Sequence, residues 1–152
     1  MSDMTFTVDD AVGIARAAHA GQVDKSGRPY LGHPLRVMGR VSGEHARMAA
    51  VLHDVVEDTA VTAADLLAAG CPAPVVDTVV ALSHRPGEPQ EDYLRRVAAD
   101  PVAVAVKRAD IADNTSPARL AALDGPTQAR LRAKYARALD LLDTFTREPS
   151  PR

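Results

Sequence analysis

The chain has 152 residues, the size of one ordinary domain with a single core. Its net charge of −2 leaves no basic excess to displace counterions from nucleic acid, so we expect no nucleic-acid partner. Apolar residues make up 46% of the chain but aromatic residues only 3%. Ala, Val and Leu must therefore fill the core, which suits close-packed helices.

The sequence carries no signal for export or membrane insertion. Its single cysteine, Cys71, cannot form an internal disulfide, which fits a reducing compartment. The first ten residues have neither a basic region nor an apolar run, and no apolar stretch approaches membrane-spanning length. We therefore expect a soluble, cytoplasmic protein with no membrane partner. No feature predicts whether it forms a homo-oligomer.

Turn residues and apolar spacing predict three helices in the first third of the chain. The first, over about residues 8–19, begins after a hydroxyl cap and ends at Gly21. The turn-rich segment 22–32 is expected to be an ordered loop, and a short helix follows over about 33–41, with proline in its first turn. The third predicted helix spans 49–59, where apolar residues recur at helical spacing.

The rest of the chain predicts five further helices, over about 62–69, 72–83, 90–99, 101–114 and 127–147. In 72–83 and 101–114, β-branched or alternating valines leave a strand as the competing interpretation. No repeat, linker or low-complexity segment divides the sequence. It therefore predicts one all-α domain over residues 1–152, with a core of about 8–147 and a frayed tail at 148–152.

Residues that carry chemistry gather in the segment 49–59, AAVLHDVVEDT. His53 and Glu57 are four residues apart, as are Asp54 and Asp58, so the two pairs should occupy neighbouring stripes of one helix surface. Charge beside an apolar run is costly unless it is paired or bound to metal. This pattern favours a metal site, and the alternative is an ordinary exposed acidic face.

Matching ligands occur elsewhere in the chain. Two imidazoles and two carboxylates form the candidate set, namely His33, His53, Asp54 and Asp110. A mixed nitrogen–oxygen set suits Mn²⁺ or Fe²⁺, and also Zn²⁺ or Mg²⁺, better than copper or a thiolate-bound metal. The alternative for each histidine alone is a hydrogen-bonded core residue.

Four segments resemble the HD-domain hydrolases, specifically the hydrolase domain of the RelA/SpoT family in its small stand-alone form. They are AHAGQ at 18–22, DKSGRPYLGHPLRV at 24–37, AAVLHDVVEDT at 49–59 and VKRADIADN at 106–114. The ordered set PYxxHP, LHDVVEDT and VKxADxxDN is specific to this family. The resemblance implies a single HD-domain helical bundle of roughly eight to ten helices.

The same resemblance implies hydrolysis of the 3′-pyrophosphate of guanosine tetra- or pentaphosphate, giving GDP or GTP and pyrophosphate. It implies one Mn²⁺, with other divalent ions as alternatives, bound by His33, His53, Asp54 and Asp110. Glu57 and Asp58 match the pair that positions and activates the attacking water. Because the synthetase and regulatory domains of longer members have no counterpart in the sequence, we expect it to degrade the alarmone and not to make it.

Five residues are candidates for substrate contacts: Lys25, Asn114, Lys134 and Tyr135, which resemble contact residues of the family, and Asp24, which occupies a contact position with a different residue. Lys25 matches a lysine beside the nucleotide, Asn114 an asparagine near the ribose, and Lys134 with Tyr135 residues at the distal 5′-phosphates. Four more cations are candidates for phosphate contacts, although a solvated surface charge is the preferred interpretation of each: Arg28, Arg85, Lys107 and Arg119.

Two positions depart from the family pattern. Asp24 stands where many members carry an arginine against the guanine base, and Leu131 stands where a basic residue is expected. An acid cannot supply the same cation–π stacking, although it could accept hydrogen bonds from a guanine edge. The alternative functions are therefore a phosphohydrolase for another nucleotide or dinucleotide and, last, a catalytically silent binding module.

Overall fold

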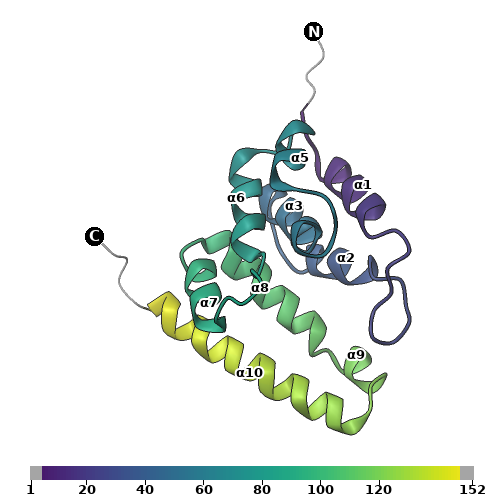
Figure 1. Cartoon of the computed structure of the whole chain (residues 1–152), viewed down its shortest axis with the longest axis vertical. Coiled ribbons are helices and arrows are strands. Elements are labelled where there is room, and N and C mark those ends of the chain that lie inside the picture. Colours follow the sequence, from purple (N-terminus) through teal and green to yellow (C-terminus); the bar gives the residue numbers. More distant parts are fainter. Residues whose placement is uncertain (1–4, 148–152) are drawn as a thin grey trace.

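The computed structural model describes residues 5–147, and within this range the chain forms ten α-helices and no strand (Figure 1). The helices are α1 (Val8–Ala18), α2 (Gly32–Met38), α3 (Glu44–Leu52), α4 (Val55–Asp58), α5 (Ala63–Ala68), α6 (Ala73–Leu82), α7 (Gln90–Ala98), α8 (Pro101–Asn114), α9 (Pro117–Ala121) and α10 (Gly125–Arg147). The all-α prediction is confirmed. None of these helices combines the length and apolar character needed to cross a bilayer.

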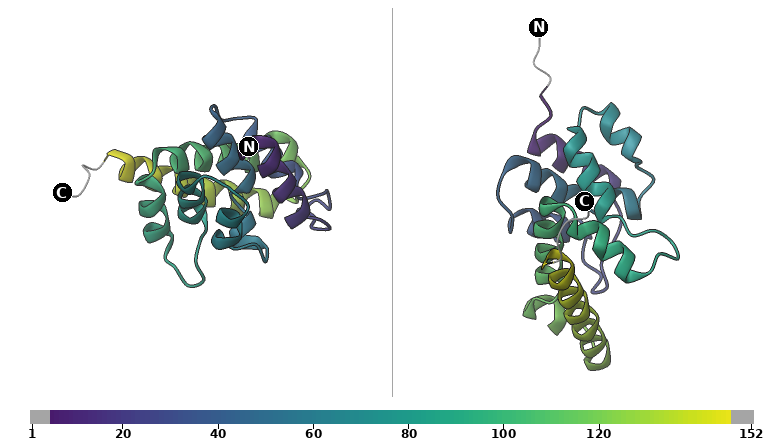
Figure 2. Two further views of the ribbon diagram at one scale, coloured as in Figure 1. Left: turned by 90° about the horizontal axis from the view of Figure 1, so that it is seen from above. Right: turned by 90° about the vertical axis from the view of Figure 1, so that its left-hand side faces the viewer.

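Helix α3 lies at the centre of the fold and packs against α1, α2, α6 and α8. Its last five residues, 48–52, are all buried, so this helix carries the middle of the core. Helix α10 packs against α7 and α8 along the lower edge of the molecule in Figure 1. Figure 2 shows that α10 and the pair α1 and α5 lie at opposite ends. Helices α2, α3 and α8 thus meet in the interior, where the site is found.

Helix starts follow the capping residues of the sequence. Thr7 accepts a hydrogen bond from the backbone N–H of Asp10, whose carboxylate in turn accepts from the N–H of Thr7. Thr62 and Asp65 form the same reciprocal pair at α5, which ends before Gly70 at φ +97°. These capping boxes satisfy N–H groups that the helix leaves unpaired and explain why both starts were predicted correctly.

The strand interpretation is wrong for both valine-rich segments, since α6 and α8 are helices. At α8, Asp100 accepts hydrogen bonds from the N–H groups of Val102 and Ala103, at 2.9 and 3.2 Å, and Pro101 occupies the first turn. This cap commits the segment to a helix. The buried residues of α8 recur at spacings of three and four along its length, as helical packing requires.

The prediction of one continuous helix over 49–59 is wrong. The chain instead forms α3 and α4, joined by a turn at His53 and Asp54. The ring Nδ1 of His53 lies 2.6 Å from the carbonyl oxygen of Ala50, and the backbone N–H of His53 donates to the same oxygen at 3.4 Å. The carbonyl three residues back thus replaces the usual partner four residues back, and the regular helix is interrupted there.

Smaller differences occur towards the C-terminus. The break predicted at 114–117 is present but shorter, at residues 115–116, because α8 includes Asn114 and a helix that the sequence did not predict, α9, begins at Pro117. Helix α10 starts at Gly125, where Asp124 accepts a hydrogen bond from the N–H of Thr127 at 2.8 Å. The predicted frayed tail at 148–152 lies outside the described residues.

Candidate functional site

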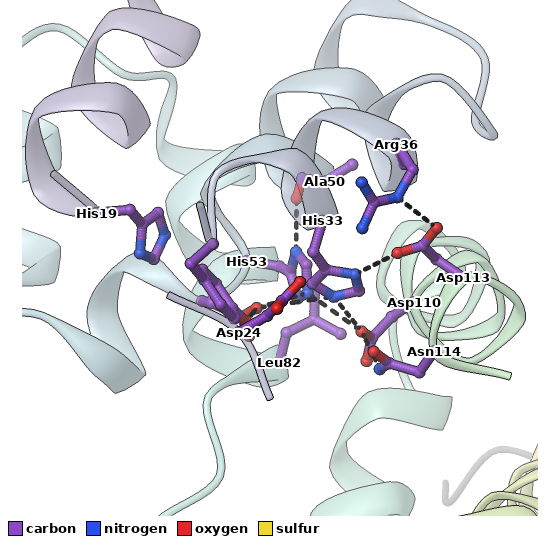
Figure 3. A network of polar contacts seen from close by, with 12 residues as sticks. His19, Asp24, His33, Arg36, Ala50, His53, Leu82, Asp110, Asp113 and Asn114 are labelled. Atoms are coloured by element: carbon purple, nitrogen blue, oxygen red, sulfur yellow. Dashed lines mark hydrogen bonds and ion pairs between the residues drawn. The ribbon is translucent and has the colours of Figure 1, made fainter. Parts of the chain in front are cut away.

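The four candidate ligands converge in the interior, although they come from three parts of the chain. Figure 3 shows three of them side by side, His33, His53 and Asp110. His33 lies in the first turn of α2, His53 and Asp54 form the α3–α4 turn, and Asp110 lies in α8. His33 Nε2 is 2.8 Å from Asp110 Oδ1 and 3.9 Å from Asp54 Oδ2. His53 Nε2 is 3.1 Å from Asp54 Oδ2 and 3.5 Å from Asp110 Oδ1. Atoms that share one cation at roughly 2.0–2.2 Å need separations of this size.

Both histidines present an unprotonated Nε2 when the ring is neutral. His53 Nδ1 faces the Ala50 carbonyl oxygen, which can only accept, so this nitrogen carries the proton. His33 Nδ1 likewise donates to the Asp113 carboxylate at 2.7 Å. Nε2 of His53 is buried and has no hydrogen-bond partner within the described residues. Metal-binding histidines are held in this way, so the ligand set fits a divalent cation.

The electrostatics of the cluster also favour added positive charge. Burial would lower the pKa of His53, but the charge of Asp54 and contacts with Asp110 outweigh it and raise that pKa well above its usual value. Burial would likewise raise the pKa of Asp110, but contacts with His33 and His53 hold it well below its usual value. Burial would also raise the pKa of Asp54, but His53 holds it below its usual value. The carboxylates of Asp54 and Asp110 therefore stay ionised in the interior, where a cation would compensate their charge.

Asp113, which the sequence reasoning missed, supports the site from behind His33. It is 1% exposed, lies one turn beyond Asp110 on α8, and accepts hydrogen bonds from Arg36 Nε at 2.8 Å and Arg119 Nη1 at 3.1 Å. Burial would raise the pKa of Asp113, but the contacts with His33 and Arg36 lower it to about 2. Its three-residue spacing from Asp110 was the signal in the sequence.

Tyr30 was also missed, and it orients another ligand. Its hydroxyl donates a hydrogen bond to Asp54 Oδ2, and its ring packs against those of His19 and His33. Burial and the neighbouring Asp54 charge raise the pKa of the phenol, so it stays a donor. The position of Tyr30 within the PYxxHP segment was the available signal.

Glu57 and Asp58 form an acidic group with Asp54, and both are more exposed than the buried ligands. A carboxylate oxygen from each lies within 4.8 Å of one from Asp54, on the short helix α4. Glu57 Oε1 accepts a hydrogen bond from the backbone N–H of His84 at 2.5 Å. Partial burial raises the pKa of both carboxyls, and repulsion from Asp54 adds to it. A carboxylate with a raised pKa accepts a proton more readily near neutral pH.

The four candidate ligands, Tyr30 and the Glu57–Asp58 pair line one cavity of about 540 Å³, whereas Asp113 lies behind His33 and does not line it. The five predicted substrate contacts line it as well: Asp24, Lys25, Asn114, Lys134 and Tyr135. Among the additional cations, Lys107 and Arg119 line the cavity, whereas Arg28 and Arg85 are exposed and do not. Lys107 Nζ lies 3.3 Å from Asp110 Oδ2 with its side chain 14% exposed, so Lys107 is not a solvated surface charge.

The lysines of the cavity are close enough to repel one another. Burial lowers the pKa of Lys134, and the charges of Lys107 and Lys25 lower it further. Lys134 Nζ also lies 5.3 Å from the centre of the Tyr135 ring. A bound anion would relieve this repulsion, so the cavity suits a phosphorylated ligand.

The two departures from the family pattern have structural explanations. Asp24 Oδ1 accepts hydrogen bonds from the backbone N–H groups of Ser26 and Arg28 and from the Ser26 hydroxyl, and Oδ2 lies 3.8 Å from Arg119. The Asp24 carboxylate therefore organises the loop before α2. Leu131 is 7% exposed and supplies an apolar part of the cavity wall.

Asn114 and Arg119 join the substrate side of the cavity to the ligands. The side-chain amide of Asn114 donates to Asp110 Oδ1 at 3.0 Å, and its oxygen accepts from Arg119 Nη1 at 2.7 Å. Arg119 also reaches Asp113, which holds His33. A group bound beside Asn114 would thus contact a network that orients two of the predicted metal ligands.

A segment of the chain is similar in sequence to known enzymes. A Haemophilus influenzae protein named guanosine-3′,5′-bis(diphosphate) 3′-pyrophosphohydrolase is 51% identical over 53 residues, 32% of this chain and 8% of that protein. The Escherichia coli bifunctional (p)ppGpp synthase/hydrolase SpoT is 44% identical over 57 residues, 35% of this chain and 8% of that protein. The matches thus span less than a tenth of these relatives. No protein-family model matches the chain.

The fold comparison covers nearly the whole chain. A solved structure described as a metazoan ortholog of SpoT that hydrolyzes ppGpp and plays a role in starvation responses has a TM-score of 0.72. The alignment covers 97% of this chain and 87% of that one, at 24% identity. The chain therefore shares the helical fold of that structure over nearly its whole length, and a segment of about a third of the chain is similar in sequence to the two enzymes above.

Proposed function

We propose that the protein is a divalent-metal-dependent hydrolase that removes the 3′-pyrophosphate from guanosine tetra- or pentaphosphate. The products would be pyrophosphate and GDP or GTP. The observation that carries the proposal is the meeting of two histidines and two aspartates beside the Glu57–Asp58 pair in a lysine-lined cavity. The names of the sequence relatives support the choice of substrate.

The four ligands would be His33, His53, Asp54 and Asp110, and we propose a single Mn²⁺ as the ion. Mixed imidazole and carboxylate ligands suit this metal, although other divalent ions also accept such a set. When bound, the ion would lower the pKa of a coordinated water towards about 7 and neutralise charge on the phosphoryl oxygens. Asp113 and Tyr30 would keep His33 and Asp54 in their ligating orientations.

Glu57 and Asp58 would orient the attacking water and accept its proton. Both lie about one helical turn beyond the ligand Asp54, and both have a raised pKa. A base needs to reach hydrogen-bond distance of the proton that it removes. We assign this role to the pair and not to either member.

The cations of the cavity would bind the phosphates. Lys107 lies beside Asp110, so it is placed for the pyrophosphate that leaves. Lys134 and Tyr135 on α10, with Lys25 on the loop before α2, would contact the remaining phosphates and the nucleoside. Because their charges repel one another when no anion is present, binding a polyphosphate relieves an unfavourable arrangement.

Asp24 favours a second candidate, the hydrolysis of another nucleotide or dinucleotide at the same centre. Its carboxylate is occupied by the loop backbone and Arg119 and offers no cation to a guanine ring. Such an enzyme would share the metal ligands and the acidic pair and differ only in the contacts to the base.

One assay separates the two candidates. Protein stripped of metal by chelation is supplied with Mn²⁺ and incubated with guanosine tetraphosphate and a panel of other nucleotides, and the products are resolved chromatographically. We expect Mn²⁺-dependent release of pyrophosphate and GDP from the alarmone. If the alarmone stays intact while another nucleotide is cleaved, the second candidate replaces the first.

A further inference from the structure

The loop at residues 83–89, between α6 and α7, reaches the acidic pair of the site. His84 lines the cavity, and its backbone N–H donates a hydrogen bond to Glu57 Oε1 at 2.5 Å. Among the described residues, the Glu57 side chain forms no other hydrogen bond. The position of the loop therefore determines the direction in which this carboxylate points.

A single arginine holds both ends of this loop. The guanidinium of Arg96, on α7, forms a two-pronged ion pair with Glu88: Nη1 contacts Oε2, and Nη2 lies 3.1 Å from Oε1. Nη2 also donates to the carbonyl oxygen of Ser83 at 2.9 Å. Glu88 Oε1 accepts from the N–H of Arg85 at 3.2 Å as well, which closes the turn. Bidentate arginine–carboxylate pairs fix geometry as well as adding energy.

The same arginine is connected to the His84 ring through Tyr93. The guanidinium carbon of Arg96 lies 5.6 Å from the centre of the Tyr93 ring, whose edge-to-face neighbour at 4.9 Å is the His84 imidazole. The Tyr93 hydroxyl donates to the carbonyl oxygen of Leu82 at 2.8 Å, just before the loop. The loop is therefore fixed at its start, at its end and through the ring of the residue that contacts Glu57.

The ion pair between Arg96 and Glu88 is more sheltered than the one between Arg108 and Asp143. The side chains of Arg96 and Glu88 are 24% and 11% exposed. In the pair formed by Arg108 and Asp143, at 2.7 Å, the side chains are 43% and 38% exposed and join two helices away from the cavity. Exposed pairs contribute little to stability, so the second pair is a suitable matched control.

We propose that Arg96 and Glu88 are positioning residues for the reaction. By clamping residues 83–89 in place, they set the His84 N–H that aims the Glu57 carboxylate, and neither needs to touch the substrate. The role of Glu57 in turnover rests on the proposed function, whereas the clamp on the loop does not.

The test compares Arg96→Gln and Glu88→Gln with the conservative Arg96→Lys and the control Arg108→Gln. In the Mn²⁺-loaded protein, the two Gln variants should lower kcat for guanosine tetraphosphate by roughly tenfold with little change in KM, because a misplaced base slows chemistry more than binding. Arg96→Lys should retain part of the rate, since it keeps one charged contact. Arg108→Gln should behave as the parent protein.

Amide hydrogen exchange at His84 supplies a readout that needs no turnover. Loss of the clamp should speed exchange of this amide by about tenfold, while the amides of α3 keep their protection. If exchange at His84 in both Gln variants equals that of Arg108→Gln, the clamp is refuted, even if the parent is active. If exchange rises but kcat does not fall, or KM rises in its place, the positioning role is refuted. An inactive parent refutes the proposed function alone.

Discussion

His33 Nδ1 donates to the Asp113 carboxylate at 2.7 Å, while Nε2 on the opposite edge of the ring lies 2.8 Å from Asp110. Two aspartates one turn apart on α8 thus contact the two nitrogens of one imidazole from α2. The contact with Asp113 places the proton of the neutral ring on Nδ1, and Nε2 then faces the centre of the cluster beside Asp110.

The first prediction concerns the hydrogen bond between His33 and Asp113. Asp113→Asn should lower Mn²⁺ affinity by about 10–100-fold, because the amide can no longer hold the His33 proton with a full charge. Isothermal titration calorimetry of chelator-stripped protein measures the change. Asp143→Asn, on α10 where the side chain is 38% exposed, is the matched control and should bind as the parent does. Equal affinity of Asp113→Asn and the control would contradict the role assigned to Asp113.

A second prediction separates ligands from proton acceptors. Asp54→Ala should lose Mn²⁺ binding and turnover together, since Asp54 Oδ2 lies between the two histidines. Glu57→Ala should still bind Mn²⁺ but lose turnover, because it removes a group beside the ligands. Metal content by atomic spectroscopy and pyrophosphate release are measured on the same preparations. Comparable metal loss in both variants would show that the roles are wrongly divided.

The third prediction concerns the loop that contains Asp24. Asp24→Ala removes the acceptor for three hydrogen bonds and should raise KM for the nucleotide several-fold, because the neighbouring Lys25 loses its support. Asp24→Asn is the control, since its amide oxygen can still accept them. Steady-state kinetics on both variants gives the comparison. An equal rise of KM in both variants would show that the negative charge beside Arg119, which both remove, matters more than the loop hydrogen bonds.

A fourth prediction tests the core through two neighbouring leucines of α5. Leu66 is 1% exposed and Leu67 is 50% exposed, so the same truncation has different costs. Leu66→Ala should lower the free energy of unfolding by about 2–5 kcal/mol, whereas Leu67→Ala should change it by about 0.5 kcal/mol or less. Urea unfolding followed by circular dichroism measures both. Similar losses in the two variants would argue against the described packing of α5.

The fifth prediction concerns Cys71, which is 4% exposed. Burial raises the pKa of its thiol from 9.0 to about 11, so at pH 8 the reactive thiolate is about a hundredfold scarcer than in an exposed cysteine. Labelling by a thiol reagent should therefore be slow in the native protein and fast in denaturant, and should quicken as the pH rises towards 11. Equal rates in native and denatured samples would contradict the burial.

The sequence predicted the helices well wherever a cap or an apolar stripe marked them. Thr7 and Thr62 reveal their helix starts because the capping side chains are local in the sequence. The turn at His53 and Asp54 was missed because apolar spacing continues through it, and the contact of the His53 ring nitrogen with the Ala50 carbonyl is not displayed by any residue pattern. Helix α9 was missed because five residues are too few for a periodic signal.

The residues of the site likewise fall into those that the sequence predicts and those that it does not. The four candidate ligands could be named from their residue types and from the family resemblance, and the structure brings them together. The supporting residues depend on contacts between distant segments: Asp113 meets His33 across 80 positions, and Arg119 meets Asp24 across the cavity. Such partners are set by packing, so a single sequence does not identify them.

The turn between α3 and α4 has a consequence for protein engineering. On an uninterrupted helix, His53 and Asp54 would project about 100° apart around the axis. In the structure the turn carries both residues, and His53 Nε2 lies 3.1 Å from Asp54 Oδ2. Transplanting the His-Asp dipeptide onto a straight helical scaffold would therefore not recreate the centre, and a graft would have to carry Ala50 and its carbonyl along with the pair.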